Sequence, residues 1–308
     1  LAYYRTLAEL VWAAVPTRTG GEDSDFSRSH FAITYIMESL AKLTGSVEEL
    51  VSIKARDLTH AYGYFEIVEL YAEEGRFDEA LAWAERGLLA FPERTDERLR
   101  DVAARELRRA GRTDKAMRLI WRRLEEAPNA SSYELLRRHA IAAGSWDGWR
   151  ERALELLEHL EAGTRSRREA SSASTARPRA ARSAPRWLDA RPESSELVTI
   201  FLGEGDPERA WSQAQLGGCS TRLWKQLAAL REHDHPDDVI PIYQDEAERA
   251  IGTKNNQGYR EGVALMSKVR ALMDLTGRSD EFPVYAAKLR AAHKPKRNLM
   301  KLLDANGW

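Results

Sequence analysis

Cysteine is nearly absent from this chain of 308 residues, which contains only Cys219. A single cysteine excludes an internal disulfide framework and a zinc site built from cysteines, and a lone cysteine is more often inert than a nucleophile. Such a composition favours a reducing compartment, so we expect a cytoplasmic protein. Long apolar runs are absent too: no stretch approaches the roughly 18 consecutive apolar residues that a membrane span needs. We therefore expect no membrane partner.

Net charge is small, because 47 basic residues stand against 48 acidic ones. This balance provides no global field that would draw the chain to nucleic acid or to a membrane surface. The opening segment, LAYYRTLAELVWAAV, has no basic start and is a poor signal peptide. Because the first residue is leucine rather than methionine, we expect the chain to be a piece of a longer protein.

Signals for strands and for enzyme sites are missing as well. No convincing period-two run is bounded by turn residues. There is no P-loop, no G-x-S-x-G elbow and no H-E-x-x-H motif. Gly203-Glu204-Gly205 lacks the third glycine and the preceding strand of a dinucleotide-binding turn, so we interpret it as a helix end. The sequence predicts a protein without catalytic activity, cofactor or bound metal.

One segment, His233-Asp234-His235-Pro236-Asp237-Asp238, is rich in metal-ligand residue types. Imidazole and carboxylate groups can hold a divalent ion. The same residues also make a good helix start, with proline at the first position and two acids that complement the helix dipole. We favour the helix start over the metal site.

What the chain does contain is an internal repeat. The stretch GRFDEALAWAERGLLAFP, from Gly75 to Pro92, is matched thirty-six residues later by GRTDKAMRLIWRRLEEAP, from Gly111 to Pro128. Within it, apolar and small residues recur every three or four positions, which is the pattern of one helix face. A glycine just past the end of the preceding helix, a small alanine and a closing proline complete a helix–turn–helix unit.

The same residues mark further units along the chain. A third unit begins at Gly144 after 33 residues and has Trp149 in place of the small alanine, as terminal repeats are often atypical. The glycine corners, small positions and helix-ending prolines are Gly75, Ala80, Pro92, Gly111, Ala116, Pro128, Gly144, Gly205, Ala210 and Gly277. A long helix is predicted from about Gln257 to Leu275.

Helix starts follow from local capping patterns. The pairs Ser46 with Glu49 and Ser131 with Glu134 fit the S-x-x-E capping box. Asp206-Pro207 and His235-Pro236 place proline at the first helical position, where its missing N–H has no cost.

An arginine-rich segment from Gly163 to Arg186 interrupts the helical pattern. It holds seven arginines, a single acid and almost no large apolar residue. Because it cannot bury enough surface to offset its ordering entropy, we predict a disordered linker between helical-repeat domains at residues 1–162 and 187–308. An arm that grips phosphate is the other interpretation. It is less favoured, because no aromatic residues interleave for base stacking.

The C-terminal stretch KLRAAHKPKRNLMKLL is basic without an interrupting acid. Lys294, Lys296, Arg297 and Lys301 are candidate contacts for phosphate or for an acidic partner. The more ordinary interpretation is that the leucines anchor a last helix while the lysines stay in water.

The repeat units resemble the tetratricopeptide repeat, since Gly75, Phe77, Ala80 and Pro92 fall at that motif's spacing. Nearly the whole chain also resembles the helical region downstream of the zinc-binding module in bacterial SWIM zinc finger proteins. The stretches that carry this resemblance are HFAITYIMESLAK, VSIKARDLTHAYGYFEIVELYAEEGRFDEALAWAERGLLAFPE, IPIYQDEAERAI and LRAAHKPKRNLMKLLD. The resemblance implies that zinc belongs to an upstream module, because the C-x-C…C-x-H arrangement of that module does not occur here.

Together these patterns predict an all-α fold, an α-solenoid of tetratricopeptide-like helix–turn–helix repeats interrupted by a flexible linker. The leading functional hypothesis is a non-enzymatic scaffold whose concave surface binds another protein or a peptide. The alternative is a nucleic-acid accessory region that acts through Arg165–Arg186 and Lys294–Lys301.

Overall fold

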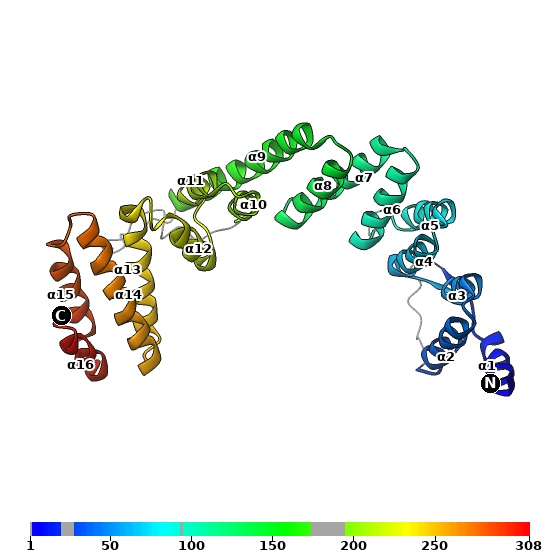
Figure 1. Ribbon diagram of the computed structural model, residues 1–308, viewed down its shortest axis with the longest axis horizontal. Helices are drawn as coiled ribbons and strands as arrows, with labels where there is room; N and C mark the ends of the chain where they lie inside the picture. The colour runs from blue at the N-terminus through cyan, green and yellow to red at the C-terminus, as the bar shows by residue number, and fades with distance from the viewer. Residues whose placement is uncertain (1, 20–27, 93–94, 174–194) are drawn as a thin grey trace. The chain divides into compact units, whose positions relative to one another are not determined.

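The computed structural model describes residues 2–19, 28–92, 95–173 and 195–308 (Figure 1). The chain is 80% helical, so the predicted all-α class is confirmed. Among the described residues, the only strands are β1 (Arg18–Thr19) and β2 (Asp57–Leu58), which form a short parallel pair. No described helix combines the length and the apolar character that crossing a membrane requires.

The chain divides into two compact units, Leu1–Ala153 and Leu154–Trp308. The first contains α1 (Ala2–Ala13), α2 (Arg28–Thr44), α3 (Val47–Lys54), α4 (Ala61–Glu73), α5 (Phe77–Ala90), α6 (Glu97–Arg109), α7 (Thr113–Glu126) and α8 (Ala130–Ala142). Helix α9 (Trp146–Ala173) crosses the boundary. The second unit continues with α10 (Glu196–Glu204), α11 (Pro207–Gly217), α12 (Thr221–Arg231), α13 (Pro236–Gly252), α14 (Asn256–Leu275), α15 (Glu281–His293) and α16 (Arg297–Ala305).

The start of the predicted linker is helical, which corrects one predicted boundary. Helix α9 runs through Gly163 and ends at Ala173. Arginine, glutamate and alanine are good helix formers, and extending an existing helix avoids the cost of nucleation. The rest of the predicted linker, residues 174–186, lies outside the described residues, as does the start of the predicted domain at residue 187.

Each predicted corner turns at a glycine in the left-handed region. The φ angles of Gly75, Gly111, Gly144, Gly205 and Gly277 are 74°, 71°, 66°, 78° and 73°. At the first corner, the N–H of Arg76 donates to the carbonyl of Tyr71 at 2.8 Å, and the N–H of Gly75 donates to Ala72 at 3.1 Å. This is the Schellman arrangement, which needs positive φ at its fifth residue. The same hydrogen bond, from an N–H to the carbonyl five residues earlier, closes the other corners; its donors are Arg112, Ser145, Asp206 and Arg278.

The small positions lie at close helix contacts. Ala80, Ala116 and Ala210 are at most 1% exposed. In the third unit, where the alanine is absent, the ring of Trp149 lies 5.5 Å from that of Trp121, so an aromatic pair fills this space. The closing prolines follow helices α5 and α7, which end at Ala90 and Glu126.

Of the four predicted helix starts, three are found. The hydroxyl of Ser46 accepts from the N–H of Glu49, Asp206 accepts from the N–H of Arg209, and His235 precedes Pro236 at the start of α13. The start at Ser131 is wrong. Helix α8 begins earlier because the Asn129 side chain accepts from the N–H of Ser132 at 2.9 Å, and asparagine caps as well as serine does.

One close approach lies at Gly87, in α5, where the sequence carries no repeat signal. A Cβ at Gly87 would lie 2.8 Å from Cβ of Tyr64 in α4 and 2.8 Å from Cδ2 of Leu99 in α6. Both neighbours belong to the core of the first hairpins, so neither has room to move.

We predict that Gly87→Ala lowers the free energy of unfolding by about 1–3 kcal/mol, because the added methyl group overpacks this contact. Gly148→Ala is the control, since a Cβ there, also in a helix of the same unit, meets nothing within 4 Å. The control variant should be as stable as wild type or slightly more stable, because alanine favours helix more than glycine does. Urea unfolding followed by circular dichroism measures both. Equal free energies of unfolding for the two variants would contradict the close approach at Gly87.

Candidate binding face of the N-terminal repeats

The first helices of three successive hairpins are neighbours in the N-terminal unit. Helix α4 packs against α6, and α6 packs against α8. Residues one repeat apart in sequence therefore meet across these helices. We call the side chains that make or border these contacts the first-helix face; they are Tyr62, Glu69, Glu97, Arg98, Asp101, Arg105 and Arg138.

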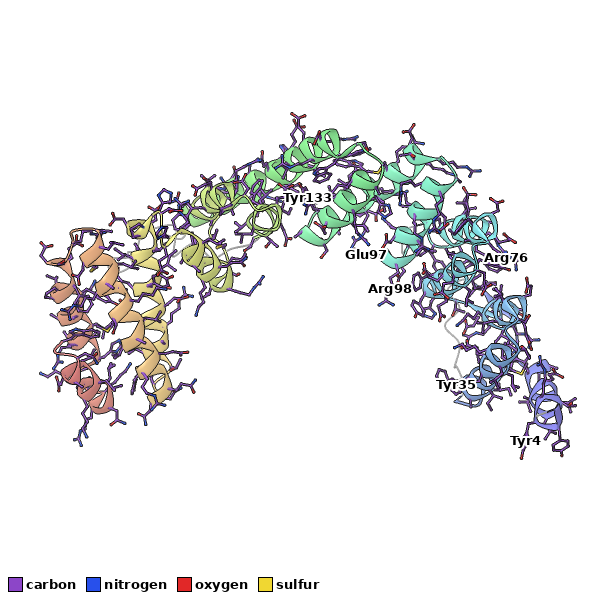
Figure 2. All side chains as sticks on the ribbon, in the orientation of Figure 1. Tyr4, Tyr35, Arg76, Glu97, Arg98 and Tyr133 are labelled. Atoms are coloured by element: carbon purple, nitrogen blue, oxygen red, sulfur yellow. The ribbon has the colours of Figure 1, made fainter. Side chains whose placement is uncertain are left out.

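At one end of this face, Arg98 lies over an aromatic ring. Its guanidinium carbon is 5.4 Å from the ring centroid of Tyr62, thirty-six residues earlier, within the range of a cation–π contact. Tyr62 is nevertheless 43% exposed. Figure 2 shows Glu97 and Arg98 together on one side of the hairpins and Arg76 on the other. Tyr62, Asp96, Glu97 and Arg98 line an open hollow of about 580 Å³.

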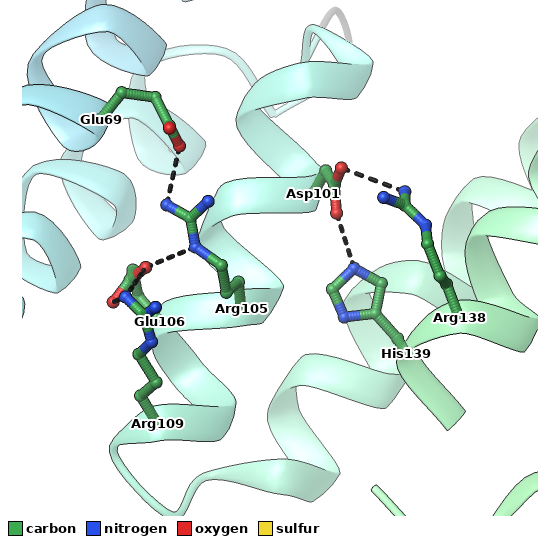
Figure 3. Close-up of polar contacts among 7 residues, drawn as sticks. All are labelled: Glu69, Asp101, Arg105, Glu106, Arg109, Arg138 and His139. Carbon is green, nitrogen blue, oxygen red and sulfur yellow. Dashed lines mark hydrogen bonds and ion pairs between the residues drawn. The ribbon is translucent and has the colours of Figure 1, made fainter. Parts of the chain in front are cut away.

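In the middle of the face, an ion-pair network joins α4 to α6 (Figure 3). Nη2 of Arg105 lies 2.7 Å from Oε1 of Glu69, and its Nε lies 2.7 Å from Oε1 of Glu106. Arg109 contacts the same Glu106 oxygen at 3.0 Å. The Glu106 side chain is fully buried, so its charge needs these two guanidinium partners.

A second network joins α6 to α8. Asp101 contacts Nη2 of Arg138 at 3.1 Å and Nε2 of the buried His139 at 2.8 Å. The hydrogen bond from His139, together with the charge of Arg138, lowers the pKa of Asp101, while burial acts in the opposite direction. The carboxylate is therefore the form that holds these two helices together.

These contacts fix three helices relative to one another and leave exposed charge of both signs. Arg138 keeps 60% of its side chain exposed, and Glu97 and Arg98 are exposed beside it along the face. Such a surface suits an extended or helical polypeptide with polar side chains. Within the described part of the chain, no group of three or more histidine, cysteine or acidic side chains is placed to hold a metal ion.

The predicted helix start at residues 233–238 is found where it was expected. His235 precedes α13, Pro236 opens the helix, and Asp238 binds Nη2 of Arg231 at 3.0 Å. His233 is 98% exposed and shares no ligand cluster. Cys219 is buried, and burial raises the pKa of its thiol to about 12, so the thiol stays protonated and unreactive at neutral pH.

The basic residues predicted near the C-terminus gather at the corner between α15 and α16. Lys294 follows α15, Lys296 precedes α16 and Arg297 opens it, while Lys301 lies one turn further along. Nζ of Lys296 donates to the carbonyl of Ile251 at 3.2 Å. Burial and the neighbouring charge of Lys254 lower the pKa of Lys296. Sequence analysis missed Lys254, which joins this cluster from the end of α13.

No protein-family model matches this chain. No curated protein matches it significantly either. The resemblance to the helical region of SWIM zinc finger proteins therefore stays a prediction that depends on the quoted stretches.

We predict that Asp101→Asn lowers the free energy of unfolding by about 1 kcal/mol at pH 7, a modest value because the carboxylate is 35% exposed and solvent screens it. Since the folded pKa is lowered, the contribution is complete above the unfolded value of about 3.9 and disappears as the pH falls through the folded pKa. The difference between wild type and variant in the free energy of unfolding should thus shrink as the pH falls below about 4.

Urea unfolding of both proteins at several pH values measures this difference. Glu155→Gln, an exposed carboxylate on α9, is the control and should change stability by less than about 0.5 kcal/mol. A variant as stable as wild type at pH 7 would contradict the role assigned to Asp101.

Proposed function

We propose that this chain is a non-enzymatic helical-repeat scaffold that binds a protein or peptide along the first-helix face. One observation carries the proposal: ion pairs at the repeat spacing tie α4, α6 and α8 together, while Tyr62, Glu97 and Arg98 stay exposed. Stacked helix pairs of this kind leave extended surfaces that serve recognition.

The geometry supports binding because the face is already ordered. Side chains held by ion pairs and by the Tyr62 ring have lost much of their rotamer freedom before a partner arrives, which lowers the entropic cost of association. Tyrosine and arginine are also the residue types that most often dominate binding energy at interfaces. We infer a partner segment that offers a carboxylate to Arg98 and a cation to Glu97.

Within a SWIM-type parent, the scaffold would hold this partner near an upstream zinc module, so zinc would lie outside these residues. We propose a cytoplasmic location, since the single buried thiol of Cys219 needs no oxidising compartment. No cofactor is required for the proposed role.

The proposal predicts that charge reversal on the face weakens binding. With the full chain as bait, the protein captured by wild type should bind Arg98→Glu at least tenfold more weakly, equivalent to about 1.4 kcal/mol. Arg118→Glu is the matched control, because Arg118 is an exposed arginine on α7, the second helix of its hairpin. The affinities of wild type and of both variants are measured with the purified partner. Loss of binding with Arg118→Glu but not with Arg98→Glu would refute the assignment.

The alternative function, nucleic-acid association, has one supporting observation. Four basic residues gather at the α13–α14 and α15–α16 corners, where burial and the charge of Lys254 lower the pKa of Lys296; they are Lys254, Lys294, Lys296 and Arg297. Binding of single- and double-stranded DNA across a salt series tests it. A steep linear fall of log affinity with log salt supports this alternative, whereas the scaffold proposal predicts no measurable binding at physiological salt.

A further inference from the structure

A cavity of about 420 Å³ lies among the first four helices of the N-terminal unit. Its volume falls in the range of small-molecule sites. The apolar part of its lining comes from Trp12, Val15 and Ile53. Trp12 and Ile53 are 8% and 2% exposed and belong to the core that joins α1, α2 and α3, so this wall is rigid.

The carboxylates that line the cavity already have partners. Glu38 and Glu66 both contact Nζ of Lys54, at 3.1 Å and 2.9 Å. Oδ1 of Asp57 accepts a hydrogen bond from the hydroxyl of Thr59 at 2.6 Å. These acids are therefore engaged by groups other than Arg56, which is one of three cationic side chains of the lining together with Arg18 and Lys54.

Arg56 lines the same cavity and is held by neutral groups. Its Nη1 donates to the carbonyls of Trp12 and Val15 at 2.5 Å and 2.9 Å, and its guanidinium carbon lies 4.6 Å from the Trp12 ring centroid. Among the described residues, no carboxylate lies within ion-pair distance of Arg56. A half-buried cation with no described carboxylate at ion-pair distance favours an anion in the adjoining space.

A histidine on the lining is oriented by its neighbours. Because the Thr59 hydroxyl donates its proton to Asp57, its oxygen accepts from Nδ1–H of His60 at 2.9 Å. This chain of hydrogen bonds fixes the ring with its proton on Nδ1, so Nε2 of the neutral ring accepts hydrogen bonds and does not donate to an anion. Thr59 is 7% exposed, so the chain of hydrogen bonds is largely shielded from water.

We propose that this cavity binds a small organic anion, a carboxylate or phosphate group carried on an apolar body. The anionic group pairs with Arg56, and the body packs on Trp12 and Ile53. The cavity shares Tyr62 with the first-helix face, but the proposed contacts of the anion are Arg56, Trp12 and Ile53, which lie outside that face, so either role can be refuted while the other stands.

Calorimetric titration of the full chain tests this with three probes: hexanoate, hexyl phosphate and neutral hexanol. At least one anion should bind tenfold or more tightly than hexanol. Binding of only one anion supports the site and identifies its head group. Absence of binding by both anions, or equal binding of hexanol, overturns the proposal.

Two variants locate the site. Arg56→Gln should remove the preference for the anion over hexanol. Because Arg56 also bonds two carbonyls, Thr34→Phe provides a second test that fills the cavity and leaves Arg56 in place. Its matched control is Ser39→Phe on the same helix. Both hydroxyls bond the carbonyl four residues earlier at 2.8 Å, but Ser39 does not line the cavity. Anion binding should be lost with Thr34→Phe and kept with Ser39→Phe; the reverse result places binding elsewhere and overturns the proposal.

Discussion

The hairpin corner closed by a left-handed glycine is the constraint on which the rest of this structure depends. At Gly75 and at Gly111 the same backbone bond links the residue after the glycine to a carbonyl five residues before, at 2.8 Å in both cases. A side chain at either glycine would meet open space, so it is the backbone conformation and not crowding that requires glycine. With the corner set, the following helix returns along the preceding one.

Regular corners have a second consequence, because they place side chains of successive hairpins opposite one another. Glu69 meets Arg105 and Asp101 meets Arg138, at separations close to the repeat length. Surface ion pairs of this kind add little stability individually. Their effect here is to link α4, α6 and α8, while the fully buried Glu106 keeps its charge paired with Arg105 and Arg109 of its own helix.

Local patterns predicted much of the fold, and their failures have physical causes. Helix α14 and the corners at Gly144, Gly205 and Gly277 were predicted because period and glycine placement are local signals. The predicted helix start at Ser131 is wrong because Asn129, two residues earlier, caps the helix instead. The predicted start of the linker at Gly163 is wrong because a polar, arginine-rich sequence can still extend a helix that is already formed.

By itself, the sequence determined the all-α class, the positions of the hairpin corners and the lack of enzyme motifs, because all three depend on residues close together in the chain. Only the tertiary structure decided which side chains share a surface. Asp101 meets His139, Gly87 meets Tyr64 and Leu99, and Arg56 lies over Trp12. A helical period tells which residues share one face of a helix, but the partner of that face is set by packing between helices that are distant in sequence.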